Sequence, residues 1–177
     1  MTRHLTTEEL AAGLAVIEAA PADGGGVEMI LARPGPDKRM ELESARLSAA
    51  EGLEGDSWSS RPSPKPDMQL TLMSSRAIGL IAGGRQNWAA AGDNLFVDID
   101  MSPENLPPGT RLALGGAEIE ITAAPHTGCD NFIDRFGRAA CVFVNTGRGK
   151  ALRMRGLNPQ VIRDGTVSRG DRVRKLP

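Results

Sequence analysis

Short runs of alternating apolar and polar residues, separated by turns rich in Gly and Pro, recur through the middle and the end of the chain. Such alternation predicts half-buried strands, because successive side chains of a strand point to opposite faces. Short strands at close spacing favour a β-barrel or a sandwich over a βαβ arrangement. The predicted strands are 27–34, 39–48, a buried strand at 69–73, 96–101, a hairpin over 111–124 around Gly115-Gly116, and two closing strands within 153–176.

Helix signals occur at three places. Thr6 followed by Glu9 has the pattern of a capping box and predicts a helix that runs to about Ala20. Residues 74–84 predict a short helix with a Ser N-cap and glycines at its end. A third helical segment lies around Gly137, and this glycine would divide it into two helices. We therefore expect a mainly β protein with flanking helices.

Length and composition fit a single domain with its own core in a chain of 177 residues. We expect residues 1–26 to form an N-terminal helix and linker and residues 27–177 to form that domain. With no Tyr, 2 Trp and 4 Phe, stacking on nucleic-acid bases is not an expected mode of binding. No apolar run approaches the roughly 20 residues that span a bilayer, and the N-terminus lacks the apolar centre of a signal peptide. These features predict a soluble, cytoplasmic protein with neither nucleic acid nor membrane as a partner.

Charge is distributed unevenly although the net charge is only -1. Residues 126–177 hold 11 Lys and Arg against 4 Asp and Glu, whereas residues 1–125 hold 10 against 18. A split of this kind is typical of a basic face that receives an anionic partner. The other interpretation is that the two halves neutralise each other across the fold.

Cys129 is the main candidate for chemistry, since it follows a Pro-His-Thr-Gly turn and precedes a predicted helix. A reactive thiolate needs nearby positive charge. His126 either deprotonates or orients Cys129, or it is an ordinary loop histidine. Cys141 lies in an apolar helical run and is expected in the core. The basic residues downstream of the thiol are Arg135, Arg138, Arg148, Lys150, Arg153 and Arg155.

Other familiar site chemistries are not supported by the sequence. Two cysteines do not form a disulfide framework. With only His4, His126, Cys129 and Cys141 to supply imidazole or thiol, a structural zinc site is not expected. Residues 145–150 lack the full phosphate-loop pattern, which argues against a nucleoside triphosphatase.

Asp56 follows Gly55 in a loop that has two interpretations. Its carboxylate either bonds nearby backbone amides in an Asx-type turn or is aimed at a binding site. The sequence leaves both open.

Several of these motifs, taken in their order, resemble the MOSC domain, which is named for the C-terminal domain of molybdenum cofactor sulfurase. Each motif alone is common, but together they span residues 53–173. The pair Gly128-Cys129 is the most specific. The others are Gly55-Asp56, Gln-Leu-Thr-Leu at 69–72, Gly92-Asp93-Asn94-Leu95, Gly109-Thr110-Arg111-Leu112, Phe136-Gly137, Arg155-Gly156-Leu157-Asn158 and Gly170-Asp171.

This resemblance implies a fold, a cofactor and a site. The fold would be a β-barrel of the MOSC, pyruvate-kinase-barrel-like type with helices at its edge. Cys129 would either carry sulfur to molybdenum or ligate molybdenum directly, with molybdenum cofactor as the ligand. Guanidinium forks suit the phosphate or carboxylate of a pterin-type cofactor, and amides suit its polar ring edge. The residues assigned to this cofactor are Arg135, Arg153, Arg155, Asn131, Asn158 and Asp56.

Two departures narrow the resemblance to the stand-alone bacterial type. The pyridoxal-phosphate desulfurase domain of the sulfurases and the extra N-terminal β-barrel of the amidoxime-reducing members have no counterpart in these 177 residues. Pyridoxal phosphate would thus enter only through a separate partner desulfurase.

The leading hypothesis is an enzyme of sulfur transfer or of molybdenum-cofactor-dependent reduction. It would use a small molecule or cofactor as substrate and a cysteine desulfurase or a redox protein as partner. The alternative is a non-catalytic module that binds a pterin cofactor or a protein through its basic C-terminal face.

Overall fold

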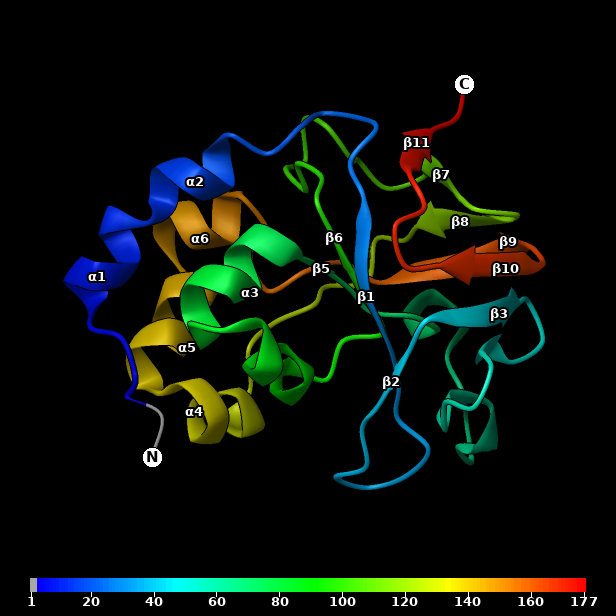
Figure 1. Cartoon of the computed structure of the whole chain (residues 1–177), viewed down its shortest axis with the longest axis horizontal. Helices are drawn as coiled ribbons and strands as arrows, with labels where there is room; N and C mark the ends of the chain where they lie inside the picture. The colour runs from blue at the N-terminus through cyan, green and yellow to red at the C-terminus, as the bar shows by residue number, and fades with distance from the viewer. Residues whose placement is uncertain (1–2) are drawn as a thin grey trace.

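The computed structural model describes residues 3–177, and in it the α-helices gather on one side of the strands (Figure 1). The α-helices are α1 (Thr7–Ala12), α2 (Leu14–Glu18), α3 (Ser75–Ala82), α4 (Asp130–Phe136), α5 (Arg138–Asn145) and α6 (Gly147–Ala151). The 3₁₀ helices are η1 (Trp58–Ser60), η2 (Pro66–Met68) and η3 (Arg85–Ala91). The strands are β1 (Val27–Ala32), β2 (Met40–Leu42), β3 (Ser44–Ser48), β4 (Gly52–Leu53), β5 (Leu72–Ser74), β6 (Leu95–Val97), β7 (Arg111–Leu114), β8 (Ala117–Ile121), β9 (Pro159–Arg163), β10 (Gly165–Ser168) and β11 (Val173–Lys175).

The strands form three sheets with the orders β2-β1-β6-β5, β10-β3-β4 and β11-β7-β8-β9. The pairings are antiparallel except for the parallel pair β5 and β6. Isolated bridges join Gly26 to Arg172 and Leu72 to Leu157, so the first and third sheets meet at two points. Mixed sheets with flanking helices are therefore confirmed. The strands of residues 3–177 do not pair into a continuous closed ring, and the closed barrel stays a prediction.

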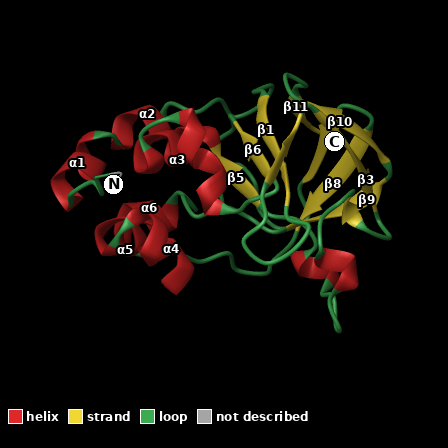
Figure 2. Cartoon of the chain, turned by 60° about the horizontal axis from the view of Figure 1, so that its bottom comes forward, coloured by secondary structure: helices red, strands yellow, loops and turns green. Residues whose placement is uncertain are grey.

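The sheet that contains β1, β5 and β6 separates two hydrophobic cores (Figure 2). Along β6, Leu95 and Val97 face the core between the sheets, whereas Phe96 faces the core beneath the helices. Along β5, Leu72 and Met73 divide in the same way. A strand buried on both faces has no polar side to show, and this explains the unbroken apolar sequence of this region.

The N-terminal helix begins as predicted, but it is not one helix. Thr6 accepts a hydrogen bond from the backbone of Glu9, and the Glu9 carboxylate accepts one from the backbone of Thr6. The helix ends at Gly13, and α2 begins at Leu14. A Cβ at Gly13 would lie 2.3 Å from the side chain of Leu80 on α3, so a larger residue there would require Leu80 to move. Within residues 3–177, no helix has the length and apolar character needed to cross a membrane.

The prediction of one continuous strand at 39–48 is wrong. The chain leaves one sheet at Glu43 and enters another, with β2 paired to β1 and β3 paired to β4 and β10. Alternation of side chains does not reveal a change of partner strand, because both strands keep the same period. The closing region likewise holds three strands, β9, β10 and β11, and α6 was not expected.

Three local predictions are confirmed. The hairpin turns at Gly115-Gly116 between β7 and β8. Ser74 caps α3 by accepting a hydrogen bond from the backbone of Ala77. Gly137 separates α4 from α5 with a φ of 88°, a left-handed value that favours glycine.

Thr6→Ala is expected to lower the free energy of unfolding by about 1 kcal/mol, because the backbone amide of Glu9 loses its acceptor. The control is Thr7→Ala, which removes a neighbouring exposed threonine and should change stability by less than about 0.5 kcal/mol. Urea denaturation of the two variants and the wild type measures both values. Equal destabilisation by the two substitutions would contradict the capping role.

Candidate functional site

The loop that follows β8 leads to Cys129, and side chains from later elements fix its path. Asn145 at the end of α5 bonds both backbone groups of Gly128, accepting from its N–H at 2.9 Å and donating to its carbonyl at 3.0 Å. A Cβ at Gly128 would lie 3.1 Å from the sulfur of Cys141 and 3.2 Å from the Asn145 amide. The residue before Cys129 is therefore held tightly against α5.

Cys129 itself is the exposed N-cap residue of α4, and its side chain makes no capping hydrogen bond. Both cysteines are free thiols, and Cys141 is buried in the helical core as predicted. The thiol of Cys129 is thus accessible from solvent while its backbone is fixed.

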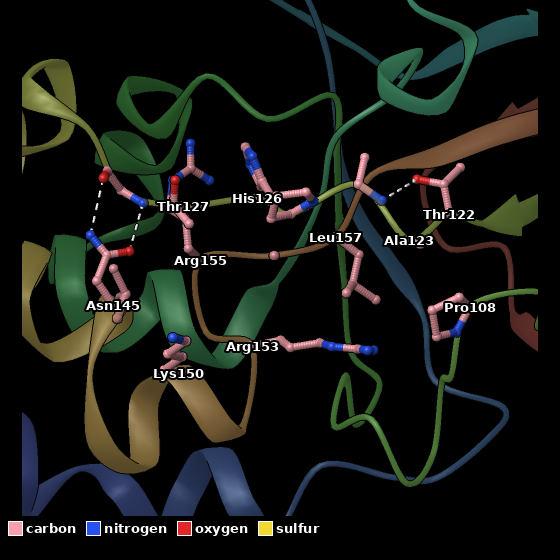
Figure 3. A pocket seen from close by; sticks show the side chains of 15 residues that line it. Pro108, Thr122, Ala123, His126, Thr127, Asn145, Lys150, Arg153, Arg155 and Leu157 are labelled. Carbon is pink, nitrogen blue, oxygen red and sulfur yellow. Dashed lines mark hydrogen bonds between the residues drawn. The ribbon is translucent and has the colours of Figure 1, made fainter.

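A cavity of about 470 Å³ opens beside this loop, and we call it the loop pocket. Its charged lining residues are all basic: Lys150, Arg153 and Arg155, joined by His126 (Figure 3). Its apolar side is formed by Pro108, Val144 and Leu157. Gly128, the residue before Cys129, also lines this pocket.

A buried carboxylate connects two of these basic residues. Asp93 is fully buried and receives the guanidinium of Arg155 at 2.7 and 3.0 Å and Nε2 of His126 at 2.8 Å. Burial alone would raise the pKa of Asp93, but the charge of Arg155 and the bond from His126 outweigh it and hold that pKa below the ordinary value. Since a carboxylate only accepts, Nε2 of His126 carries the proton of their bond.

Arg155 is anchored rather than free. Besides Asp93, its guanidinium lies 5.1 Å from the ring centre of Phe132 on α4 and within reach of the Ala91 carbonyl at 3.5 Å. Its Nε atom is buried and has no hydrogen-bond partner among residues 3–177. A charge-neutralised and stacked arginine mainly fixes the wall of the pocket.

Arg153 differs from Arg155 in its backbone and its surroundings. Its φ of 50° is left-handed, which is uncommon for a residue with a side chain and costs about 1 kcal/mol or more. Its guanidinium donates to the carbonyl of Leu106 at 2.7 Å. Burial lowers the pKa of Arg153, and the negative charge of Glu104, which raises that pKa, only partly offsets this effect. The protein thus holds a partly desolvated cation in the loop pocket.

The arginines that the sequence assigned to one ligand lie in two different places. Arg135 and Asn131, both on α4, line a second hollow of about 580 Å³ together with Arg33, Arg39 and Arg61. We call it the arginine hollow. Arg153 and Arg155 line the loop pocket instead. No lining residue is shared, so the two basic cavities are separate: the loop pocket includes Gly128, just before Cys129, and the arginine hollow includes Asn131, two residues after it.

Asp56 and Asn158, both assigned to the ligand from the sequence, line neither cavity. Asp56 accepts from the backbone amides of Arg33 and Trp58 and from the Arg33 guanidinium at 2.8 Å. The backbone-amide interpretation is therefore confirmed. Burial raises the pKa of Asp56, but the hydrogen bonds and the charge of Arg33 outweigh it and hold that pKa below the ordinary value. Asn158 is buried and donates to the carbonyls of Ala124 and Pro125, which holds the start of the Cys129 loop.

Three residues of this site were not singled out as site residues from the sequence. Asp93 was visible within a Gly-Asp-Asn-Leu motif, but Gly-Asp pairs are common and only burial distinguishes this one. Asn145 and Lys150 were noted as part of a rejected phosphate-loop pattern. His126 is paired with Asp93, and among residues 3–177 no hydrogen bond links it to Cys129, so the suggested activation of the thiol by His126 stays a prediction.

Comparisons with known proteins show the fold of this chain. The sequence matches no family profile, and no curated protein is significantly similar to it. Several solved structures are similar over most of the chain. A hypothetical protein has a TM-score of 0.59 at 18% identity, covering 88% of this chain and 69% of its own. YuaD from Bacillus subtilis has a TM-score of 0.58 at 16% identity, covering 86% and 95%, and YiiM from Escherichia coli has 0.56 at 20% identity, covering 86% and 70%.

YuaD and YiiM are MOSC-domain proteins. The chain therefore has the fold of the MOSC proteins, and the resemblance stated from its motifs is confirmed at the level of the fold. At identities of 20% and below, activity and ligands do not follow from the likeness.

The two thiols should differ sharply in reactivity. In the native protein, Cys129 is expected to react with a thiol reagent such as dithionitrobenzoate at once, because it is exposed, and Cys141 only after unfolding. Cys129→Ser should remove the fast phase and Cys141→Ala should retain it. Two thiols reacting at the same rate in the native state would contradict this placement.

Asp93→Asn is expected to lower the free energy of unfolding at pH 7 by about 3–5 kcal/mol, because it leaves Arg155 buried without its countercharge. Since the folded pKa of Asp93 is depressed, its contribution is complete above the unfolded pKa of about 3.9 and is lost as pH falls through the folded value. The variant should therefore lose less stability between pH 6 and pH 3 than the wild type.

Glu43→Gln is the control for this measurement, since it removes an exposed partner of Arg169 and should cost less than about 1 kcal/mol. Denaturant titrations across pH give both quantities. A cost for Asp93→Asn no larger than for Glu43→Gln would show that the buried pair does not stabilise the fold.

Proposed function

We propose that this protein is a stand-alone MOSC-type enzyme in which Cys129 acts on molybdenum cofactor or on sulfur destined for it. The observation that supports this most is the position of the exposed thiol, directly after Gly128, which lines the basic loop pocket. Thiol chemistry beside an anionic ligand needs this combination of access and positive charge. The structural likeness to YuaD and YiiM supports the same class of domain.

The loop pocket fits an anionic, pterin-type cofactor. Its volume of about 470 Å³ lies in the range of small-molecule sites. Lys150 and Arg153 would hold the phosphate, and Arg155, whose charge is neutralised by Asp93, would fix the wall beside them. A thiolate suits molybdenum as a soft ligand. When bound, the cofactor would supply a metal centre for redox chemistry on a substrate.

The metal would depend on ligands from the cofactor. Among residues 3–177, no group of three or more His, Cys, Asp or Glu side chains could hold a metal ion. Cys129 would be the ligand from the protein, and the rest of the coordination sphere would come with the bound group.

As a sulfur carrier, Cys129 needs no metal of its own. Its thiolate would attack the outer sulfur of a donor persulfide, so that the donor S–S bond breaks and the donor leaves as a thiolate. A nucleophilic acceptor would then take the outer sulfur from the Cys129 persulfide and restore the thiolate. A cysteine desulfurase as donor, or a redox protein in the reductive version, is proposed on chemical grounds.

His126 would handle the proton in either version. Asp93 fixes its Nε2 as a donor, and in the neutral ring this leaves the lone pair of Nδ1. The side chain is 14% exposed and lines the loop pocket, so a ligand there could exchange a proton with it.

Metal and sulfur analysis of protein purified from cells that make molybdenum cofactor tests this proposal. We expect near-stoichiometric molybdenum, or a persulfide on Cys129, in the wild type and in Cys141→Ala, and neither in Cys129→Ser. Molybdenum lost with the thiol would indicate ligation, whereas persulfide without molybdenum would indicate a carrier. Neither signal in folded wild-type protein, or retention of either by Cys129→Ser, would refute a role for this thiol and leave the non-catalytic binding module.

A further inference from the structure

The arginine hollow is lined by the turn between β1 and β2, by residues at the two ends of η1, and by α4. Four arginines line it, and Asp37 is its one acidic lining residue. Asp37 has a left-handed backbone, with a φ of 57°, and its side chain is 93% exposed. The hollow therefore carries more positive charge than its own residues neutralise.

One of the four arginines is already saturated. Arg33 donates to the Asp56 carboxylate at 2.8 and 3.3 Å, to Asn94 at 2.8 Å and to the Gly92 carbonyl at 3.1 Å. Its charge is neutralised by Asp56, which is itself buried. Arg33 thus forms a rigid wall and has few donors left for a ligand.

The other three arginines lack such acceptors within residues 3–177. Arg135 approaches Asp37 only at 3.8 Å, which is longer than a hydrogen bond. Arg39 donates to the carbonyl of its neighbour Lys38. Burial lowers the pKa of Arg39, and the charges of Arg135 and Arg33 lower it further, which reflects like charges held close together. Arg61 forms no ion pair in the described part of the chain.

We propose that the arginine hollow binds the phosphate group of a small phosphorylated molecule through Arg39, Arg61 and Arg135. A phosphate offers two negative charges and three free oxygens, which matches three guanidinium groups better than a singly charged carboxylate does. The volume of about 580 Å³ is far larger than one phosphate needs and lies in the range of sites for organic ligands. Asn131 and Ser57 line the same hollow and supply neutral hydrogen bonds to the rest of the ligand.

This site is independent of the function proposed for Cys129, because none of its arginines lines the loop pocket. The proposal would stand if Cys129 had no role in sulfur or molybdenum chemistry.

Isothermal titration calorimetry with inorganic phosphate and with phenyl phosphate tests the proposal, in chloride buffer at constant ionic strength. We expect both probes to bind and phenyl phosphate to bind more tightly. Arg39→Gln and Arg135→Gln should each weaken binding at least tenfold, because each removes a charged fork. Arg135→Lys should fall between wild type and Arg135→Gln, since it keeps the charge and loses the fork.

Arg46→Gln and Arg169→Gln are the matched controls, because each removes an exposed arginine that lines neither cavity, and both should bind the two probes within twofold of the wild type. Loss of binding in Lys150→Gln with full binding in the hollow variants would place the anion in the loop pocket and overturn the proposal. Absence of binding to the folded wild type would also overturn it. Binding of inorganic phosphate alone would refute the organic ligand. Thermal unfolding of each variant shows that lost binding is not lost folding.

Discussion

The buried turn Gly92–Asn94 holds the two cavities in place, because its polar groups bond in opposite directions. Asp93 and Asn94 are both fully buried. Asp93 binds Arg155 and His126 on the side of the loop pocket, whereas Asn94 and the Gly92 carbonyl bind Arg33 on the side of the arginine hollow. Buried polar groups are stable only when they are fully paired, so neither wall can shift without leaving a charge unpaired.

This turn is placed by the strand that follows it. β6 runs through the sheet that is buried on both faces, and its residues Leu95 to Val97 contact both hydrophobic cores. The same sheet pairs β6 with β5, while the bridge from Leu72 to Leu157 brings the segment of Arg155 alongside. Apolar packing thus determines where a small set of buried hydrogen bonds can form, and those bonds fix the walls of the two cavities.

Much of the fold could be predicted from local patterns, and the site only in part. The capping box at Thr6, the hairpin and the break at Gly137 depend on neighbours in sequence, so the sequence is sufficient for them. The split of 39–48 between two sheets depends on distant partner strands, which alternation does not report. Arg135 and Arg155 look alike in sequence. In the fold, Asp93 neutralises Arg155, whereas Arg135 lies near only an exposed carboxylate. Only the folded chain separates an anchoring arginine from one that is free to bind.

That distinction also bears on the thiol. The two arginines that the fold surrounds most completely, Arg33 and Arg155, are each paired with a buried carboxylate and contribute little net charge. The positive charge that remains comes from Lys150 and Arg153 in the loop pocket and from the free arginines of the hollow. Cys129 follows Gly128, which lines the loop pocket, and precedes α4, which carries Arg135 into the hollow. The buried carboxylates of Asp56 and Asp93 thus leave the unpaired cations on the accessible linings of the two cavities, where an anionic ligand would meet them.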